Sequence, residues 1–239
     1  AASDEAVRRH MNVLTDLGLT PVALEPTPVA LARCAARTLR RESDREEVRV
    51  IVDMGLHSTK VVMLRGNRVV FFKPIDLGGA RISQAVAERL DLSQADAVAL
   101  RQRLCEGDGE GTDEADERLF GSTRRDSVRR AVHEATRPVM SDLAREIGLC
   151  LRYFSVTFRG KRPEQVDLVG GEAYDPALAE RIGEQLELRV QTLRPLDGID
   201  LSADSVRLER RDVAAEWAVA TGLALRQVGA GAKRMRGAA

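Results

Sequence analysis

The stretch Val52-Asp53-Met54-Gly55-Leu56-His57-Ser58-Thr59-Lys60 leads out of one apolar strand signal and into the next. A tight turn with an Asp, a Gly and two hydroxyls can hold a phosphate through backbone N–H groups and Ser58 or Thr59, while Asp53 orients a hydrated Mg²⁺. The same residues also suit a plain hairpin turn, with Asp accepting backbone hydrogen bonds and Gly taking a positive φ. Taken alone, the turn favours the plain hairpin.

The pattern around this turn predicts a β-meander. Strand signals cover residues 48–53, 59–64 and 69–75, and Gly66-Asn67 supplies the turn between the last two. Helices are expected over residues 3–17, 27–40 and 79–90, and from a Ser93 N-cap to about residue 105.

The second half of the chain alternates helices and short strands. Helical spacing runs from about residue 127 to 158, and Pro138 predicts a break near its middle. A strand over 166–169, a helix over 175–186, a strand over 189–192 and a helix over 212–227 follow. This order predicts an α/β fold with a mixed sheet flanked by helices.

Composition excludes several classes of protein. The 239 residues contain 37 basic and 37 acidic side chains, so no global field attracts nucleic acid or an anionic membrane. No apolar run is long enough to span a membrane, and no secretory signal is visible, which favours a cytoplasmic location. The three cysteines and three histidines are widely scattered, which argues against a disulfide framework or a zinc site.

A second candidate motif is Val166-Asp167-Leu168-Val169-Gly170-Gly171-Glu172-Ala173. An apolar strand that runs into a diglycine and then a helix lets a flat ring or a phosphate approach the backbone, close to a helix N-terminus that favours anions. Its plain interpretation is a strand-to-helix connection that needs positive φ. Each motif is weak alone, but their order along the chain is informative.

An Asp-x-Gly hairpin followed by a strand, a diglycine and a helix resembles the phosphate-2 and adenosine motifs of the actin, Hsp70 and sugar-kinase superfamily. Within it, the sequence resembles the type IV pilus assembly protein PilM family, near FtsA. Nearly the whole chain contributes, through residues 17–21, 28–33, 51–55, 58–60, 68–75, 78–79, 92–97, 146–154, 170–171 and 218–226.

The resemblance implies a lobe of an actin-like (ribonuclease H-like) ATPase fold that takes part in a cleft for ATP and Mg²⁺. The first motif is expected to bind phosphate and Mg²⁺, with Asp53 towards the metal. The second motif is expected to contact the adenosine. The residues are Asp53, Gly55, Ser58, Thr59 and Lys60 for the first, and Gly170, Gly171 and Glu172 for the second. Lys60 as a solvated strand-end lysine stays an alternative, and the Glu172 carboxylate either caps its helix or repels a nucleotide.

The family also implies a domain organisation. We expect residues 1–40 to be a remnant of a first lobe, 41–228 to form the second lobe with an inserted helical subdomain at about 91–137, and 229–239 to be a flexible basic tail. The chain does not begin with Met, and we expect a piece that lacks most of the first lobe, including a second Asp-x-Gly hairpin. Such a piece is expected to be inactive alone, and the whole protein at most a weak ATPase.

Three functions remain open from the sequence. The first is an ATP-binding cytoplasmic scaffold of type IV pilus or type II secretion assembly, peripheral at the inner membrane through the cytoplasmic tail of a PilN-like partner, with self-association possible. The second is a nucleotide-free interaction module of the same fold, suggested by Glu172. The third is a small-molecule kinase of the same superfamily. Gly78-Gly79 and the closing Thr221-Gly222-Leu223-Ala224-Leu225-Arg226 favour the pilus family over kinases.

Overall fold

The computed structural model describes residues 3–37, 46–106, 122–158, 163–199 and 213–226. Its centre is a five-stranded mixed sheet in the order β3-β2-β1-β4-β5. The strands are β1 (Val48–Met54), β2 (Thr59–Arg65), β3 (Arg68–Ile75), β4 (Gln165–Val169) and β5 (Arg189–Thr192). The meander β1-β2-β3 is antiparallel, whereas β4 and β5 run parallel to β1.

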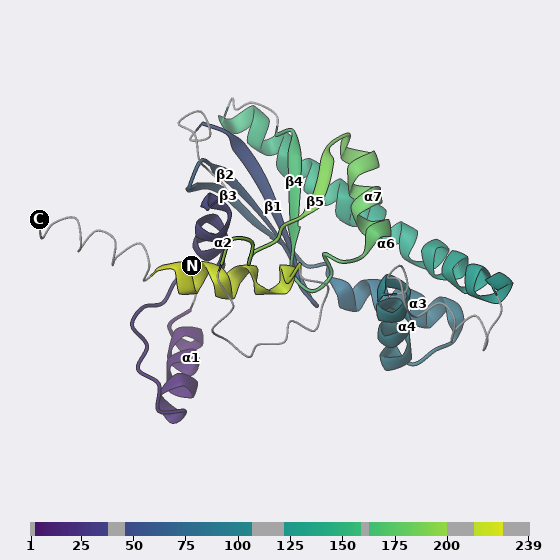
Figure 1. Ribbon diagram of the computed structural model, residues 1–239, viewed down its shortest axis with the longest axis horizontal. Coiled ribbons are helices and arrows are strands. Elements are labelled where there is room, and N and C mark those ends of the chain that lie inside the picture. The colour runs from purple at the N-terminus through teal and green to yellow at the C-terminus, as the bar shows by residue number, and fades with distance from the viewer. Residues whose placement is uncertain (1–2, 38–45, 107–121, 159–162, 200–212, 227–239) are drawn as a thin grey trace, which may run out of the picture.

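Alternating side chains give the sheet two apolar faces. Val50, Val52 and Met54 of β1 pack on one face, together with α6 (Ser122–Phe158) and α7 (Pro176–Leu186). Ile51 points to the opposite face and packs with α2 (Thr27–Ala36) and Ala218 of the helical residues 218–226. Figure 1 shows the sheet between these helices. Burial on both sides explains why β1 reads as an almost continuous apolar run.

A smaller helical layer lies at one end of the sheet (Figure 1). It consists of α3 (Gly79–Leu90), α4 (Gln94–Glu106) and the N-terminal half of α6. Its core is formed by Val86, Ala97 and Val132, one residue from each helix. The predicted insertion at about 91–137 would include α4 and the start of α6 but not α3, and its residues 107–121 lie outside the described residues.

The expected break at Pro138 is wrong, because α6 is one helix of 37 residues that contains this proline. Val132 packs in the α3-α4 layer before Pro138, and Leu143, Ile147 and Phe154 pack on the sheet after it. Burial of both halves offsets the backbone hydrogen bond that a proline removes.

The ends of the described chain lie near α2. Helix α1 (Asp4–Asp16) starts at a Ser3 N-cap, as predicted, and has no buried residue. The final helix begins with the 3₁₀ turn η2 (Ala215–Trp217) and continues through residue 226. Among the described residues no helix is both long and apolar enough to cross a membrane. The expected tail at 229–239 lies outside the described part of the chain.

Candidate nucleotide site

The two glycine turns lie next to each other at the same end of the sheet. Asp53 of β1 is in register with Val169 of β4, so Gly170 follows directly beside the end of β1. Gly170 has φ +93°, and a Cβ at this position would lie 2.4 Å from the Met54 carbonyl oxygen and 2.9 Å from Asp53 Oδ1. Parallel pairing of β1 and β4 therefore brings together two motifs that are far apart in the sequence.

The first turn, Gly55 to Ser58, is closed by a 3.0 Å hydrogen bond from the Gly55 amide to the Ser58 carbonyl oxygen. Its carbonyl groups accept from the start of α3: the Gly79 amide donates to Gly55 at 3.0 Å and the Ala80 amide donates to Leu56 at 2.7 Å. The first amides of α3 are thus used inside the protein and do not form an anion site of their own. They hold the turn in place.

The side chains of this turn have different surroundings. Thr59 is fully buried, and its hydroxyl donates to the Leu77 carbonyl oxygen at 2.7 Å. Ser58 is half-buried, and within the described structure its hydroxyl has no hydrogen-bond partner. Lys60 donates to the Asp53 carboxylate across β1 and β2 at 3.0 Å. Of the two hydroxyl groups in this turn, only that of Ser58 is left without a hydrogen-bond partner among the described residues.

The two glycines of the second turn differ in their backbone conformation and in the space around them. Gly170 is required by the fold, because of its positive φ and its contact with Met54. Gly171 is exposed, has no positive φ, and a Cβ there would meet nothing within 4 Å. Packing among the described residues gives no reason for glycine at position 171, so the open space in front of it is where a flat ligand can approach.

Glu172 is held by a residue that sequence reasoning missed. Arg101 of α4 is 6% exposed and donates to the Glu172 carboxylate at 2.6 Å and to Asp175 at 3.3 Å. Burial alone would lower the pKa of the Arg101 guanidinium, but the nearby carboxylates outweigh burial and raise this pKa. The signal in the sequence is faint: Arg101 follows the buried Ala97 by four residues and so lies on the inner face of α4.

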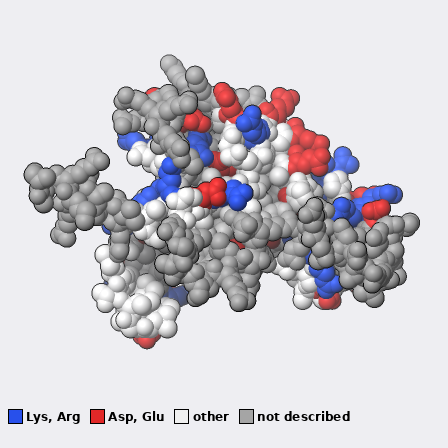
Figure 2. All heavy atoms as spheres, viewed as in Figure 1, with Lys and Arg blue, Asp and Glu red and all other residues white. Residues whose placement is uncertain are grey.

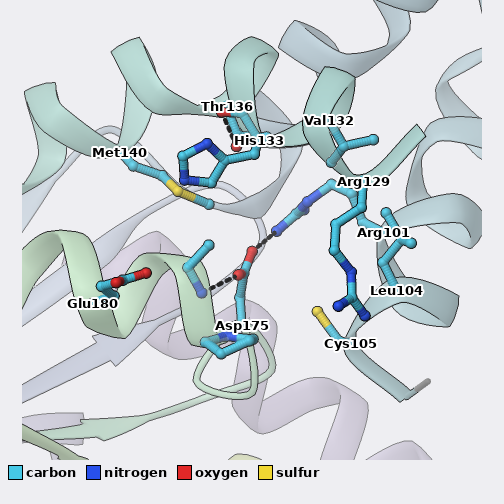
Figure 3. A pocket seen from close by; sticks show the side chains of 12 residues that line it. Arg101, Leu104, Cys105, Arg129, Val132, His133, Thr136, Met140, Asp175 and Glu180 are labelled. Carbon is cyan, nitrogen blue, oxygen red and sulfur yellow. Dashed lines mark hydrogen bonds and ion pairs between the residues drawn. The ribbon is translucent and has the colours of Figure 1, made fainter. Parts of the chain in front are cut away.

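A cavity of about 220 Å³ lies beside this ion cluster, between α4, α6 and α7. Figure 3 shows Arg101 reaching Asp175 on one side of it, with His133 and Met140 of α6 on the other. Asp175 also caps α7, because its carboxylate accepts from the Ala177 amide at 3.1 Å and from the Leu178 amide at 3.4 Å. Its carboxylate is therefore shared between the helix cap and the guanidinium.

The residues at the first turn fit a Mg²⁺ ion that is contacted through water and not bound directly. No group of three or more His, Cys, Asp or Glu side chains in the described structure is placed to hold a metal ion. Mg²⁺ bound with a nucleotide needs one or two carboxylates plus phosphates and waters. Asp53 is such a carboxylate, but one oxygen is taken by Lys60 and the other lies against Gly170. This arrangement fits a metal contact through water.

The sequence pattern of the family described as "Type IV pilus assembly protein PilM" matches residues 109–228, half of the chain. The chain belongs to the PilM family. Its fold is that of the actin-like ATPases, with the mixed sheet and flanking helices that the sequence predicts. No curated protein sequence matches the chain.

Solved structures of similar fold cover nearly the whole chain. A PilM-PilN type IV pilus biogenesis complex has a TM-score of 0.74 at 24% identity, covering 95% of this chain and 59% of that one. Ethanolamine utilization protein EutJ from Carboxydothermus hydrogenoformans has a TM-score of 0.59 at 19% identity, covering 90% and 59%. MreB5 of Spiroplasma citri bound to AMPPNP has a TM-score of 0.55 at 11% identity, covering 99% and 68%. The present chain thus spans 59% of the PilM chain that it matches.

Proposed function

We propose that this PilM-family chain supplies one wall of an ATP and Mg²⁺ site in a cytoplasmic scaffold of type IV pilus assembly. The observation that carries the proposal is the adjacency of Asp53 and Gly170, because Gly170 directly follows Val169, the residue of β4 in register with Asp53 of β1. The half-buried Ser58 and the exposed Gly171 follow the ends of β1 and β4 and so lie at the same end of the sheet. The similar fold of MreB5, whose structure holds AMPPNP, supports a nucleotide as the ligand.

Each proposed site residue has a role that its contacts allow. Ser58 and Lys60 bind phosphate, while Gly55 and Thr59 keep the turn rigid through hydrogen bonds to the Ser58 and Leu77 carbonyl groups. Asp53 orients hydrated Mg²⁺ and fixes Lys60. The backbone at Gly170, Gly171 and Glu172 faces the adenosine. When bound, Mg²⁺ would neutralise phosphate charge. The chain itself holds the phosphates in position and contributes the charges of Asp53 and Lys60.

The test is calorimetric titration of the intact protein with ATP and Mg²⁺. We expect Asp53→Ala to abolish binding, and the isosteric Asp53→Asn to weaken it at least tenfold if the carboxylate charge is what matters. Asp142→Ala, which removes an exposed carboxylate on α6, serves as the matched control. Unchanged ATP affinity in both Asp53 variants, with their folds intact by circular dichroism, would show that the assignment is wrong.

A second candidate is a nucleotide-free interaction module of the same fold. It is favoured by one observation: the charged side chains of both turns already have partners within the protein, Asp53 with Lys60 and Glu172 with Arg101. Titration of the wild-type protein that detects no heat or competition with ATP up to millimolar concentration would favour this candidate.

We also propose that the whole protein binds the cytoplasmic tail of a PilN-like inner-membrane protein and is peripheral at that membrane through it. The fold similarity to the PilM-PilN complex supports this partner. A synthetic tail peptide of the PilN-like protein should bind the intact protein in titration, whereas a scrambled peptide should not. Self-association is tested in parallel by sedimentation at several concentrations, with and without ATP.

The charge distribution gives no reason to add nucleic acid to these partners. Lys and Arg alternate with Asp and Glu over the described part of the face shown in Figure 2. A polyanion needs a continuous basic surface to displace its counterions. If high salt weakens ATP binding, we would attribute the effect to the charges of the proposed site, since this face has no continuous basic surface.

A further inference from the structure

Arg101 is the only Lys or Arg side chain that is buried among the described residues, and it joins several elements. Its guanidinium donates to Ser83 of α3 at 2.9 Å and to the Gly79 carbonyl oxygen at 3.4 Å. It also donates to Glu172 in the diglycine turn and to Asp175 at the start of α7. One side chain from α4 therefore ties α3 to the diglycine turn and to α7.

The cluster is not arranged for stability alone. Arg101 Nε is buried and has no hydrogen-bond partner among the described residues. Leaving a buried donor unsatisfied is unfavourable, and a buried ion pair often stabilises a fold no better than apolar packing would. An Arg in such a position is a candidate for a role beyond folding.

Glu172 is the partner through which such a role would act. Its side chain is 20% exposed, and a Cβ on Gly79 would lie 1.9 Å from its Oε1 atom. Glu172 therefore lies directly against the glycine whose amide holds the first turn. It also follows Gly171, which faces open space. Without a counter-charge, this carboxylate would repel a polyphosphate bound between the two turns.

We infer that Arg101 is a positioning residue for the proposed nucleotide site, which acts by neutralising the Glu172 carboxylate. The inference rests on the proposed function and adds a residue of α4, outside both turn motifs, to the site. It assigns to Arg101 no contact with the nucleotide. Its effect on binding passes through the Glu172 carboxylate.

A double-mutant cycle separates this role from a purely structural one. We expect Arg101→Met to weaken Mg-ATP binding about tenfold or more, since it leaves a negative charge beside the site. Glu172→Gln alone keeps the shape of the side chain, removes the charge that Arg101 neutralises, and gives the reference affinity for the cycle. In the double variant Arg101→Met/Glu172→Gln the affinity should return to within about threefold of wild type.

Two further measurements complete the design. Arg101→Lys keeps the positive charge and should retain most of the affinity, and Arg145→Met, an exposed arginine on α6, is the matched control. Affinity for Mg-tripolyphosphate should fall along with that for Mg-ATP in Arg101→Met, and affinity for adenosine should change little, because the unpaired carboxylate repels phosphate charge. Thermal melts of every variant show whether it is folded.

The outcomes are distinct. Wild-type protein that binds no nucleotide overturns the proposed function and this inference together. Wild-type binding with unchanged affinity in Arg101→Met overturns only the inference. Weakened binding that the double variant does not recover, or an equal loss for adenosine and tripolyphosphate, shows that Arg101 only supports the fold, and this also overturns the inference. If Arg101→Met does not fold, the same criteria apply to Arg101→Gln, which also removes the charge, and to its double variant with Glu172→Gln.

Discussion

The Lys60 ammonium group lies 3.0 Å from the Asp53 carboxylate, directly opposite it across β1 and β2. The Asp53 side chain is 10% exposed, and Lys60 is its ion-pair partner. We expect Lys60→Met to lower the free energy of unfolding by about 1–2 kcal/mol, because it leaves a buried carboxylate unpaired. Urea denaturation of the variant measures this loss.

The control for this pair is Lys73→Met, which removes an exposed lysine from β3 and should leave stability within about 0.5 kcal/mol of wild type. The double variant Asp53→Asn/Lys60→Met should recover part of the loss, since no charge is then left without a partner. A double variant less stable than Lys60→Met would contradict this account of the pair.

The two neighbouring glycines at the end of β4 should respond in opposite ways to alanine. Gly170→Ala places a Cβ 2.4 Å from the Met54 carbonyl oxygen at a positive φ, and we expect a loss of about 2 kcal/mol or more in the free energy of unfolding. Gly171→Ala meets nothing within 4 Å and should leave the melting temperature unchanged. If the nucleotide approaches there, Gly171→Ala should instead weaken ATP binding in titration.

Gly222 sets how closely the final helix packs on α2. A Cβ at this position would lie 2.0 Å from the Ala30 carbonyl oxygen, which is backbone and cannot rotate away. Gly222→Ala should therefore destabilise the fold by several kcal/mol, about 3 or more. Gly148→Ala on α6 is the comparison, because its Cβ would meet only the end of the Leu186 side chain at 3.0 Å. A lower melting temperature for Gly148→Ala than for Gly222→Ala would be evidence against the close contact between the final helix and α2.

Cys34 gives a prediction about pH. The thiol is 4% exposed, and burial raises its pKa from 9.0 to about 11, against smaller opposing effects of Arg37 and Arg49. Between these values the unfolded chain loses the thiol proton while the folded chain keeps it, so stability should fall as pH rises, by at most about 1.4 kcal/mol per pH unit.

The matching measurement is thiol alkylation of the native protein near pH 8. Half-buried Cys105 should react first, and Cys34 should react only on unfolding. In Cys34→Ser the loss of stability between pH 9 and 11 should be reduced relative to wild type. Rapid modification of Cys34 without unfolding would show that the thiol is accessible.

Local signals explain how much of the fold could be predicted from the sequence. The expected helix over residues 79–90 matches α3 residue for residue, and all five strands lie within one residue of their expected ends. The adjacency of Asp53 and Gly170 follows from parallel strands, whose ends meet at one edge of the sheet. What each of these residues binds stays a proposal.

Long-range contacts account for what the sequence did not show. Pro138 predicted a break, but the two halves of α6 are each buried in a different core. Arg101 carries no local pattern, because its partners Glu172 and Asp175 are more than 70 residues away. The Thr59 hydroxyl looked available in the turn, yet it is taken by the Leu77 carbonyl group, which only the meander brings close.

The continuity of α6 has a mechanical consequence. A helix of 37 residues is about 55 Å long, and its two ends lie in different layers of the molecule. It can act as a lever: a tilt of about 5° at the sheet end would displace the far end by roughly 5 Å over this length. Small adjustments beside the sheet are thereby enlarged at the tip of the helix, and Pro138, which lacks an N–H donor, marks where such a lever bends most easily.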